Sequence, residues 1–477
     1  MTFSTSQPES NDLRTSPPQR HVSPTARPCA RRTGDLWLFA VIGVLVAGCA
    51  VATPFTQRAH ISKQITERAG HGVRGDTAAT VALPPGVSIA DGISEDQAVA
   101  VALWNNAAFQ QTLSQLQLAR ADLAQAGMLT NPNLSVLFPL GPKQLEFAAM
   151  IPLEALWMRP IRARIATLDA ERIASALVQS GLDLVRDVRW ALSDLALARD
   201  RAAIAKKTQT LRRRIAEISE GLASAGDATG VSVLSAQAEA AAADAALVRV
   251  QADVVVADQR LLLLLGLCET APDAQFILAP TRRWPLANRS DLERLALAAR
   301  PDLRAAELSL EAAAERAGLA TAEIFTLSAI VDANGQGNKG FEMGPGLLVG
   351  LPIFNQNQTG RLRAEAELER AAWNYLAARQ RIVSEVRQAD ASVRQAAAAL
   401  RTQSEDAVPK FEEVVSKSER MYAMGELAAL DLQLNTQQLV AAQLRQAELA
   451  GDLRRARADL DRSLGADPTR WKEPVKP

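Results

Sequence analysis

The sequence predicts a mainly helical protein with a small β part, in which two tandem repeats share one order of helix, β-hairpin, long helix and helix. Three observations support this fold class. Only 4% of the 477 residues are aromatic, and alanine, leucine, arginine and glutamate dominate, which is typical of long helices. Two stretches of about 62 residues each run almost without proline. The chain also matches itself at an offset of about 194 to 200 residues.

Charge and histidine content exclude several function classes. Lysine plus arginine and aspartate plus glutamate both number 53, so the net charge is zero, which argues against a nucleic-acid binder. The three histidines, His21, His60 and His71, all precede the first periodic segment, and the cysteines have no metal-ligand spacing. A body without histidine argues against a histidine metal site or a catalytic triad. We therefore expect no enzymatic activity, no metal and no cofactor.

The first residues, 1–48, are predicted to be a disordered leader that ends in a signal peptide. An apolar run over 36–48 is too short to span a bilayer as a helix. It ends in Val46-Ala47-Gly48-Cys49, which resembles the lipobox of bacterial lipoproteins. We expect cleavage before Cys49 and a covalent lipid such as palmitate on it, with a membrane anchor and an incidental cysteine as the alternative. Residues 49–91 lack a helical period and are predicted to be an extended, lipid-anchored tether.

The repeats are predicted to occupy 92–268 and 291–467, joined by a proline-bearing linker over 269–290. Ala102-Leu103 matches Ala296-Leu297, Ala225-Gly226 matches Met424-Gly425, and Leu265-Gly266 matches Leu464-Gly465. Several separate matches at nearly one offset indicate a true internal repeat. The tail over 468–477 is predicted to be disordered.

The helices of each repeat have matching lengths. The first repeat is predicted to hold helices over 95–126, 160–221 and 231–265, and the second has its long helix over 360–423 and its last helix over 430–464. At 1.5 Å per residue the first long helix would measure about 93 Å. The two shorter helices together are about as long, so we expect them to lie end to end beside it, in a tall antiparallel wall.

The hairpins are predicted over 131–152 and 325–352. In the second, apolar and polar residues alternate, with Ile330 breaking the pattern: Leu327, Ala329, Val331 and Ala333 against Ser328, Asp332 and Asn334. Four strands cannot close a membrane barrel, because the smallest need eight. We therefore expect a symmetric oligomer of two, three or more copies, each contributing four strands to one barrel.

Residues 92–467 resemble the outer-membrane efflux protein family of TolC type. The markers are Ile93-Ser94-Glu95-Asp96-Gln97-Ala98, Asn105-Asn106, Asn131-Pro132 and Tyr422-Ala423-Met424-Gly425 followed by Leu430-Asp431-Leu432. The resemblance implies a homotrimer, with twelve strands in one outer-membrane β-barrel and a helical tunnel through the periplasm of a Gram-negative bacterium. It also implies a passive duct of a tripartite efflux system for small toxic compounds or metal ions. An inner-membrane pump would drive it through a periplasmic adaptor, also called a membrane fusion protein.

The resemblance assigns roles to several residues. Gly226 and Gly425 sit where helices reverse sharply, which favours glycine, and with Asp227, Met424 and Glu426 they would form the tips that contact the adaptor; plain turns without a partner are the alternative. Asp431 would contribute to a ring of three carboxylates at the tunnel constriction, or be a solvated aspartate near a helix start. Tyr422 would help to close the constriction, or serve only in packing.

Aromatic residues flank the predicted strands, and they could anchor the protein at the membrane interfaces or pack helix against barrel: Trp157, Phe325, Phe341 and Phe354. The competing functions are an exit duct for type I protein secretion, a periplasmic adaptor and a structural coiled coil of the envelope. An adaptor would have one helical hairpin and a run of short strands, and a structural coiled coil would lack matched β-hairpins.

Overall fold

The computed structural model describes residues 54–75, 80–138, 145–226, 228–277, 288–335 and 340–465. The chain divides into the units Met1–Cys49 and Ala50–Pro477, and every described residue belongs to the second unit. The leader, Cys49 and the tail therefore lie outside the described residues, as does Asp227.

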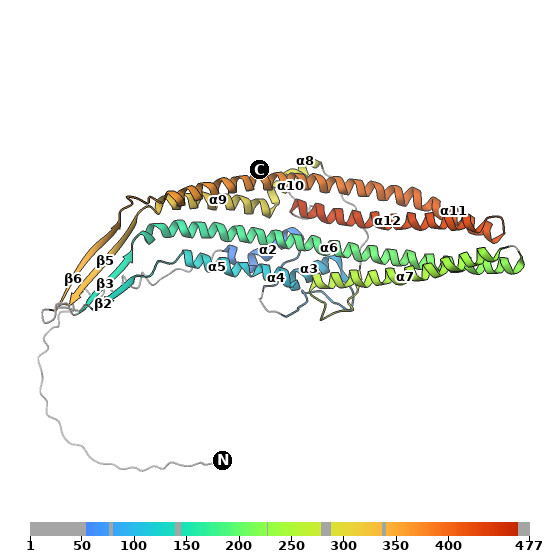
Figure 1. Ribbon diagram of the computed structural model, residues 1–477, viewed down its shortest axis with the longest axis horizontal. Coiled ribbons are helices and arrows are strands. Elements are labelled where there is room, and N and C mark those ends of the chain that lie inside the picture. Colours follow the sequence, from blue (N-terminus) through green and yellow to red (C-terminus); the bar gives the residue numbers. More distant parts are fainter. Residues whose placement is uncertain are drawn as a thin grey trace, which may run out of the picture. The chain divides into compact units, whose positions relative to one another are not determined.

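Four rows of helices lie side by side in the helical part (Figure 1). Two of these rows are long. One, in the middle, is α6 (Glu154–Ala225), and the other, at the outer side, is α10 (Gln358–Thr402) followed by α11 (Val408–Ala423). Two shorter helices lie end to end beside each: α5 (Gln115–Ala126) and α7 (Gly230–Leu265) along α6, and α9 (Pro301–Ala322) and α12 (Ala429–Leu464) along α10 and α11. The expected end-to-end stacking is confirmed. Helix α6 joins the repeats, because it packs on both α9 and α12.

The opening helix of each repeat is broken, whereas we predict one helix over 95–126. The first repeat has α3 (Glu95–Asn105), α4 (Ala107–Leu113) and α5, and the second has α8 (Arg289–Ala299) and α9. The break in the first repeat falls at Asn106, whose side chain caps α4 by accepting from the Phe109 N–H. The break in the second falls at Arg300, because Pro301 disfavours helical backbone in the residue before it.

The long helices also differ from the prediction. Helix α6 begins at Glu154 and runs through Pro160, which lies beyond its first turn and removes one intrahelical hydrogen bond. Its start is fixed on the sheet, because the Leu327 N–H donates to the Glu154 carboxylate at 3.1 Å. The predicted helix over 360–423 is interrupted by a π-helical turn, Gln403–Ala407, just before Pro409. Proline lacks an N–H and its ring crowds the preceding turn, which explains the wider turn there.

Residues 49–91 are not an extended tether throughout. Residues Pro54–Thr56 form a 3-10 turn, η1, and Arg58–Ala69 form helix α2, which packs on α6. Ile61 and Ile65 of α2 are fully buried in the core of the first repeat. Gly181 of α6 makes room for this contact, because a Cβ there would lie 2.6 Å from Cδ1 of Ile65. The segment is therefore part of the folded body.

Both predicted hairpins are present and form one antiparallel sheet. Its strands are β2 (Asn133–Leu137), β3 (Glu146–Pro152), β5 (Thr326–Gly335) and β6 (Phe341–Gly350), in the order β2-β3-β5-β6. The register places Leu134 opposite Ala149, Ala149 opposite Val331, and Val331 opposite Pro345. Pro345 has no N–H to donate, and it lies in an edge strand of this sheet. The chain's remaining described strands, β1 (Ile93–Ser94) and β4 (Phe276–Ile277), pair in parallel beside α3.

Candidate functional sites on the sheet and at the helical tips

The four-stranded sheet has one face without any polar side chain. Residues paired across antiparallel strands point to the same face, so the register assigns every strand position to one of two faces. One face carries only apolar side chains: Leu134, Val136, Phe147, Ala149, Ile151, Leu327, Ala329, Val331, Ala333, Met343, Pro345, Leu347 and Val349. We call it the apolar sheet face. It includes the alternating residues predicted for the second hairpin, and Ile330 lies on the other face.

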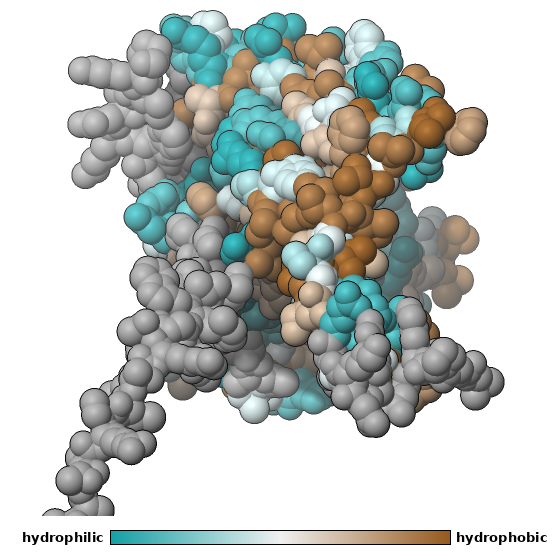
Figure 2. All heavy atoms as spheres, turned by 90° about the vertical axis from the view of Figure 1, so that its left-hand side faces the viewer, coloured by the Kyte–Doolittle hydropathy of each residue, from teal (hydrophilic) through white to brown (hydrophobic). Residues whose placement is uncertain are grey.

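The opposite face holds every polar residue of the four strands: Asn133, Ser135, Glu146, Thr326, Ser328, Asp332, Asn334 and Glu342. The apolar sheet face is exposed, with Leu134 and Leu347 each 68% exposed; on the opposite face Ser328 is buried, while Asn133, Ser135 and Glu342 are exposed. Figure 2 looks onto the strand-bearing end and shows apolar side chains gathered beside a hydrophilic region. An exposed sheet face made only of apolar side chains is the reverse of a sheet in a water-soluble core.

Exposed aromatic side chains occur where the strands meet the helices. Phe354 is 92% exposed, Phe325 58% and Trp157 40%. Phe341 lies in β6, but its side chain is outside the described residues. Phe354 is thus almost uncovered within one chain, whereas Phe325 and Trp157 are partly covered by their neighbours.

The two helical tips use the same turn chemistry. Gly226 ends α6 at φ 89° and Gly425 follows α11 at φ 75°, a left-handed conformation that glycine adopts without steric cost. At the second tip the Glu426 N–H donates to the Met421 carbonyl at 2.9 Å, which satisfies a free carbonyl at the helix end. Met424 is 64% exposed and Glu426 is exposed as well. Each tip therefore presents its turn residues to the surroundings.

Tyr422 does not face solvent but packs between the two hairpins. Its ring is buried with Ile215 and Leu432, and its hydroxyl lies 2.8 Å from the Ser219 hydroxyl of α6. Ser219 is a residue that sequence reasoning missed. A second link between the hairpins runs from Arg212 to Glu239 at 3.3 Å and from Glu239 to Gln433 of α12. We call these two links the tip contacts.

Asp431 lies in the first turn of α12 with its side chain exposed. Its backbone N–H donates to the Ala428 carbonyl at 3.1 Å, and no ion pair to it occurs among the described residues. Leu430 and Leu434 beside it are exposed as well. The structure thus leaves the carboxylate free, and does not bring it into contact with Tyr422, which is buried on the other side of the turn.

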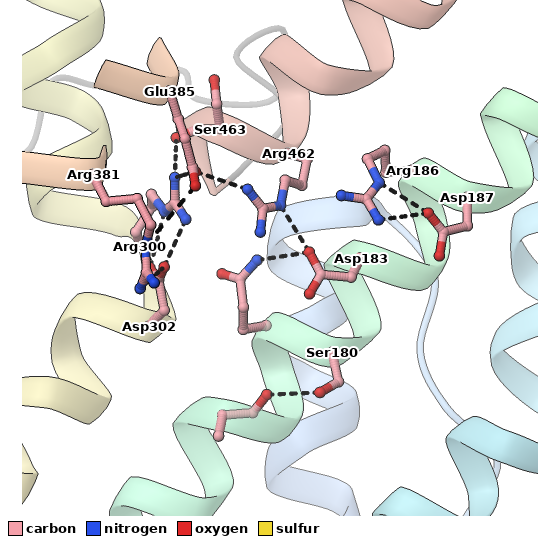
Figure 3. A network of polar contacts seen from close by, with 12 residues as sticks. Ser180, Asp183, Arg186, Asp187, Arg300, Asp302, Arg381, Glu385, Arg462 and Ser463 are labelled. Atoms are coloured by element: carbon pink, nitrogen blue, oxygen red, sulfur yellow. Dashed lines mark hydrogen bonds and ion pairs between the residues drawn. The ribbon is translucent and has the colours of Figure 1, made fainter. Parts of the chain in front are cut away.

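Ion pairs hold the two repeats together farther from the tips. Arg462 of α12 binds Asp183 of α6 and Glu385 of α10, both at 2.8 Å (Figure 3). Arg300, whose side chain is fully buried, lies between Asp302 and Glu385 in the same network. Along α6 and α12 the pairs continue: Arg189–Asp461, Arg455–Asp194 and Arg201–Glu448, at 2.6, 2.5 and 2.9 Å. We call this series the inter-repeat ion pairs.

No cluster of His, Cys, Asp or Glu able to hold a metal occurs in the part of the chain that the structure describes. Within those same residues, no helix is both long and apolar enough to cross a membrane.

Comparisons with known proteins agree with this geometry. A sequence model of the family "Outer membrane efflux protein" matches residues 292–466. The second repeat of this chain is similar to that family, and the match covers just over a third of the chain. A comparison with curated protein sequences found no match. The match to the family model covers α8 to α12 and both strands of the second hairpin, and the first repeat has the same order of elements.

Solved structures of channels share the fold of both repeats. The outer-membrane channel OprN superposes with a TM-score of 0.68 at 21% identity, over 78% of this chain and 90% of that one. VceC, an outer membrane protein of Vibrio cholerae, gives 0.68 at 20% identity over 78% and 96%. The CmeC outer membrane channel of Campylobacter jejuni gives 0.69 at 13% identity over 79% and 86%. At these identities the likeness shows the fold, which this chain shares with these outer-membrane proteins.

Proposed function

We propose that this chain is the outer-membrane channel of a tripartite efflux system in a Gram-negative bacterium. The observation that carries the proposal is the apolar sheet face. Thirteen apolar side chains on one face, with all polar residues on the other, form the alternation of strands that face lipid outside and water inside. An exposed apolar surface of this extent would be unstable in water. The likeness of the second repeat to the outer membrane efflux proteins supports a transport role without catalysis.

The open edges of the fold support assembly of identical copies. Strands β2 and β6 are edge strands, and unpaired strand edges are not tolerated in lipid. At one side of the helical part, α7 buries only four of its 36 residues and exposes Val248 and Val255. At the other side, α10 exposes Trp373 and Leu376. Pairing β6 and α10 of one copy with β2 and α7 of the next would cover both edges, and three copies would close a twelve-stranded barrel.

The tips support contact with an adaptor and a constriction. Gly226, Met424, Gly425 and Glu426 are placed on exposed turns, where an adaptor would reach them. In a threefold assembly Asp431 would form a ring of carboxylates, which would favour cations. Asp227 would belong to the first tip. An inner-membrane pump would supply the energy.

A lipid on Cys49 would attach the folded body to the membrane. Only residues 50–53 separate Cys49 from η1, which already packs on α6, so the connection spans at most about 18 Å. Labelling with radioactive palmitate should mark the wild-type protein and leave Cys49→Ser unmarked. The aromatic residues Trp157, Phe325, Phe341 and Phe354 would lie at the membrane interface.

We propose that the channel exports small toxic compounds or metal ions. Export of a protein by type I secretion is the second candidate function, because it would use the same architecture. The amphipathic sheet disfavours a periplasmic adaptor and a structural coiled coil, because neither needs a face directed at lipid. A deletion strain complemented by the gene would separate the two cargo classes: restored resistance to small toxic compounds supports efflux, and restored export of a protein alone supports secretion.

Two measurements on the purified protein test the channel. Unheated samples from outer-membrane fractions should migrate as a trimer in gels and convert to monomer on heating. In planar bilayers the protein should give stable conductance steps. Protein that is monomeric in the soluble fraction and shows no conductance would refute the proposal.

A further inference from the structure

A cavity of about 280 Å³ lies where α2, α6 and the joint between α8 and α9 meet. It lies apart from the apolar sheet face and from the tips. Its polar walls come from three elements: His60, Gln64 and Arg68 of α2, Ser175 and Glu171 of α6, and Arg304 with Glu307 of α9. Its volume is close to the lower end of ligand pockets, roughly 300 Å³. The function proposed above does not use it.

The wall formed by α2 is a row of hydrogen-bonding side chains. His60, Gln64 and Arg68 are spaced four residues apart and so lie on one face of the helix. Arg68 Nη1 donates to Gln64 Oε1 at 3.3 Å, and Gln64 Nε2 lies 3.0 Å from His60 Nε2. Because the Gln64 amide donates to Nε2, a neutral His60 carries its proton on Nδ1. The two ends of the row, the Arg68 guanidinium and the His60 ring, therefore both carry N–H groups that can donate hydrogen bonds.

The orientation of this row is fixed by the core. Ile61 and Ile65 are fully buried, and Ile65 packs over Gly181 of α6. With these two side chains directed at α6, the face with His60, Gln64 and Arg68 lines the cavity. The α2 wall is thus part of the rigid fold.

The charges at the cavity are compensated on one side only. On the α9 side, Arg304 binds Glu171 at 3.1 Å and Glu307 at 3.3 Å, so these carboxylates already have a cation. Arg68 donates to two oxygens of Gln64, and no carboxylate pairs with it among the described residues. Its Nε is buried without a hydrogen-bond partner. Burial lowers the pKa of Arg68, and the charge of Glu67 only partly opposes this, as expected for a cation short of a counter-ion.

We propose that this cavity binds a small oxyanion, a carboxylate or phosphate group of a free solute, through the guanidinium of Arg68 and the hydroxyl of Ser175. A charged donor binds an oxyanion more strongly than a neutral one, and an anion here supplies the counter-charge that Arg68 lacks. The bound group contacts α2 through Arg68 and α6 through Ser175. Binding therefore fastens α2 to α6.

Calorimetric titration of the full chain in detergent tests the site, with inorganic phosphate and succinate as probes in a buffer free of both. We expect saturable binding of at least one probe at one site per chain. Arg68→Gln should weaken it about tenfold or more. Lys63→Gln is the matched control, because it removes the same charge from the same helix at a side chain that is 77% exposed, and it should change the affinity less than twofold.

A second variant guards against loss of folding. Ser175→Ala removes only the hydroxyl and should weaken binding about threefold or more. Hydrogen exchange of α2 backbone amides should slow when the binding probe is added to wild type and not when it is added to Arg68→Gln. Absence of saturable binding of both probes, or equal losses in Arg68→Gln and Lys63→Gln, would overturn the proposal. Conductance is measured separately, so neither result depends on the channel.

Discussion

The two neighbouring leucines of β6, Leu347 and Leu348, allow the direction of the sheet to be tested with one chemical change. Leu347 lies on the apolar sheet face, paired with Ala329, and is 68% exposed. Leu348 lies on the polar face, paired with Ser328, and is 48% exposed. An arginine directed into lipid costs about 2–4 kcal/mol near the bilayer midplane. In a trimer the penalty is incurred three times, so we predict that Leu347→Arg strongly lowers the yield of assembled channel, whereas Leu348→Arg leaves it near the wild-type level.

The assay is the amount of heat-modifiable trimer in outer-membrane fractions, measured at equal total expression. The pair is matched in residue type, strand and substitution, so only the face differs. Equal loss in both variants would show that the strand itself, and not its lipid-facing side, is sensitive. Normal assembly of Leu347→Arg would refute the assignment of the apolar sheet face to lipid.

Three further predictions concern the helical part. Tyr422→Phe removes the hydrogen bond to Ser219, which contributes about 0.5–1.5 kcal/mol, so single-channel recordings should show open probability rising about two- to tenfold; an unchanged value would mean that this bond does not hold the tip. Asp431→Ala should reduce the cation preference of the channel, measured as a reversal potential in a salt gradient, and an unchanged potential would remove the carboxylate ring. The pKa of Asp459 is raised mainly by burial, against the opposing charges of Arg186 and Arg462. Its ionisation therefore destabilises the fold above that raised pKa, so Asp459→Asn should unfold at a higher temperature at pH 7. The gain should shrink as the pH falls toward the ordinary value of 3.8, and a gain that is independent of pH would contradict this reasoning.

Periodic and repeated features were predictable from the sequence. The hairpins over 131–152 and 325–352, the long helices and their end-to-end partners all follow from spacing of apolar residues, turn residues and proline. The alternation around Val331 also indicated a two-faced sheet. That all polar residues of the four strands share one face required the register between β3 and β5, which joins strands from different repeats. Sequence periodicity describes one strand at a time and cannot supply that pairing.

The missed features depend on contacts between distant segments. Helix α2 has only two buried residues, Ile61 and Ile65, and Ile65 packs where Gly181 of α6 has no side chain. Ser219 lies 203 residues from Tyr422 in sequence, and no local pattern marks it as the partner. The π-helical turn before Pro409 was signalled by the proline, but a helix can bend, stop or widen there, and packing against α12 decides among these outcomes.

The distribution of contacts between the repeats indicates where the channel would open. The inter-repeat ion pairs follow α6 and α12 from Asp183 to Arg201, and at the Asp183 end Arg462 bridges two carboxylates at once. Opening this series would break several ion pairs together, and because their side chains are partly exposed each pair contributes at most about 1 kcal/mol. Beyond Arg201 the described polar links between the hairpins are the two tip contacts alone, and the π-helical turn lies on this side, with Gln403 bonded to the Ala442 carbonyl at 2.9 Å. Opening beyond Arg201 would therefore break only two polar links between the hairpins, whereas opening the rest of the wall would also break the whole ion-pair series. We therefore infer that opening is confined to the segment between the π-helical turn and the tip, while the ion pairs keep the rest of the wall closed.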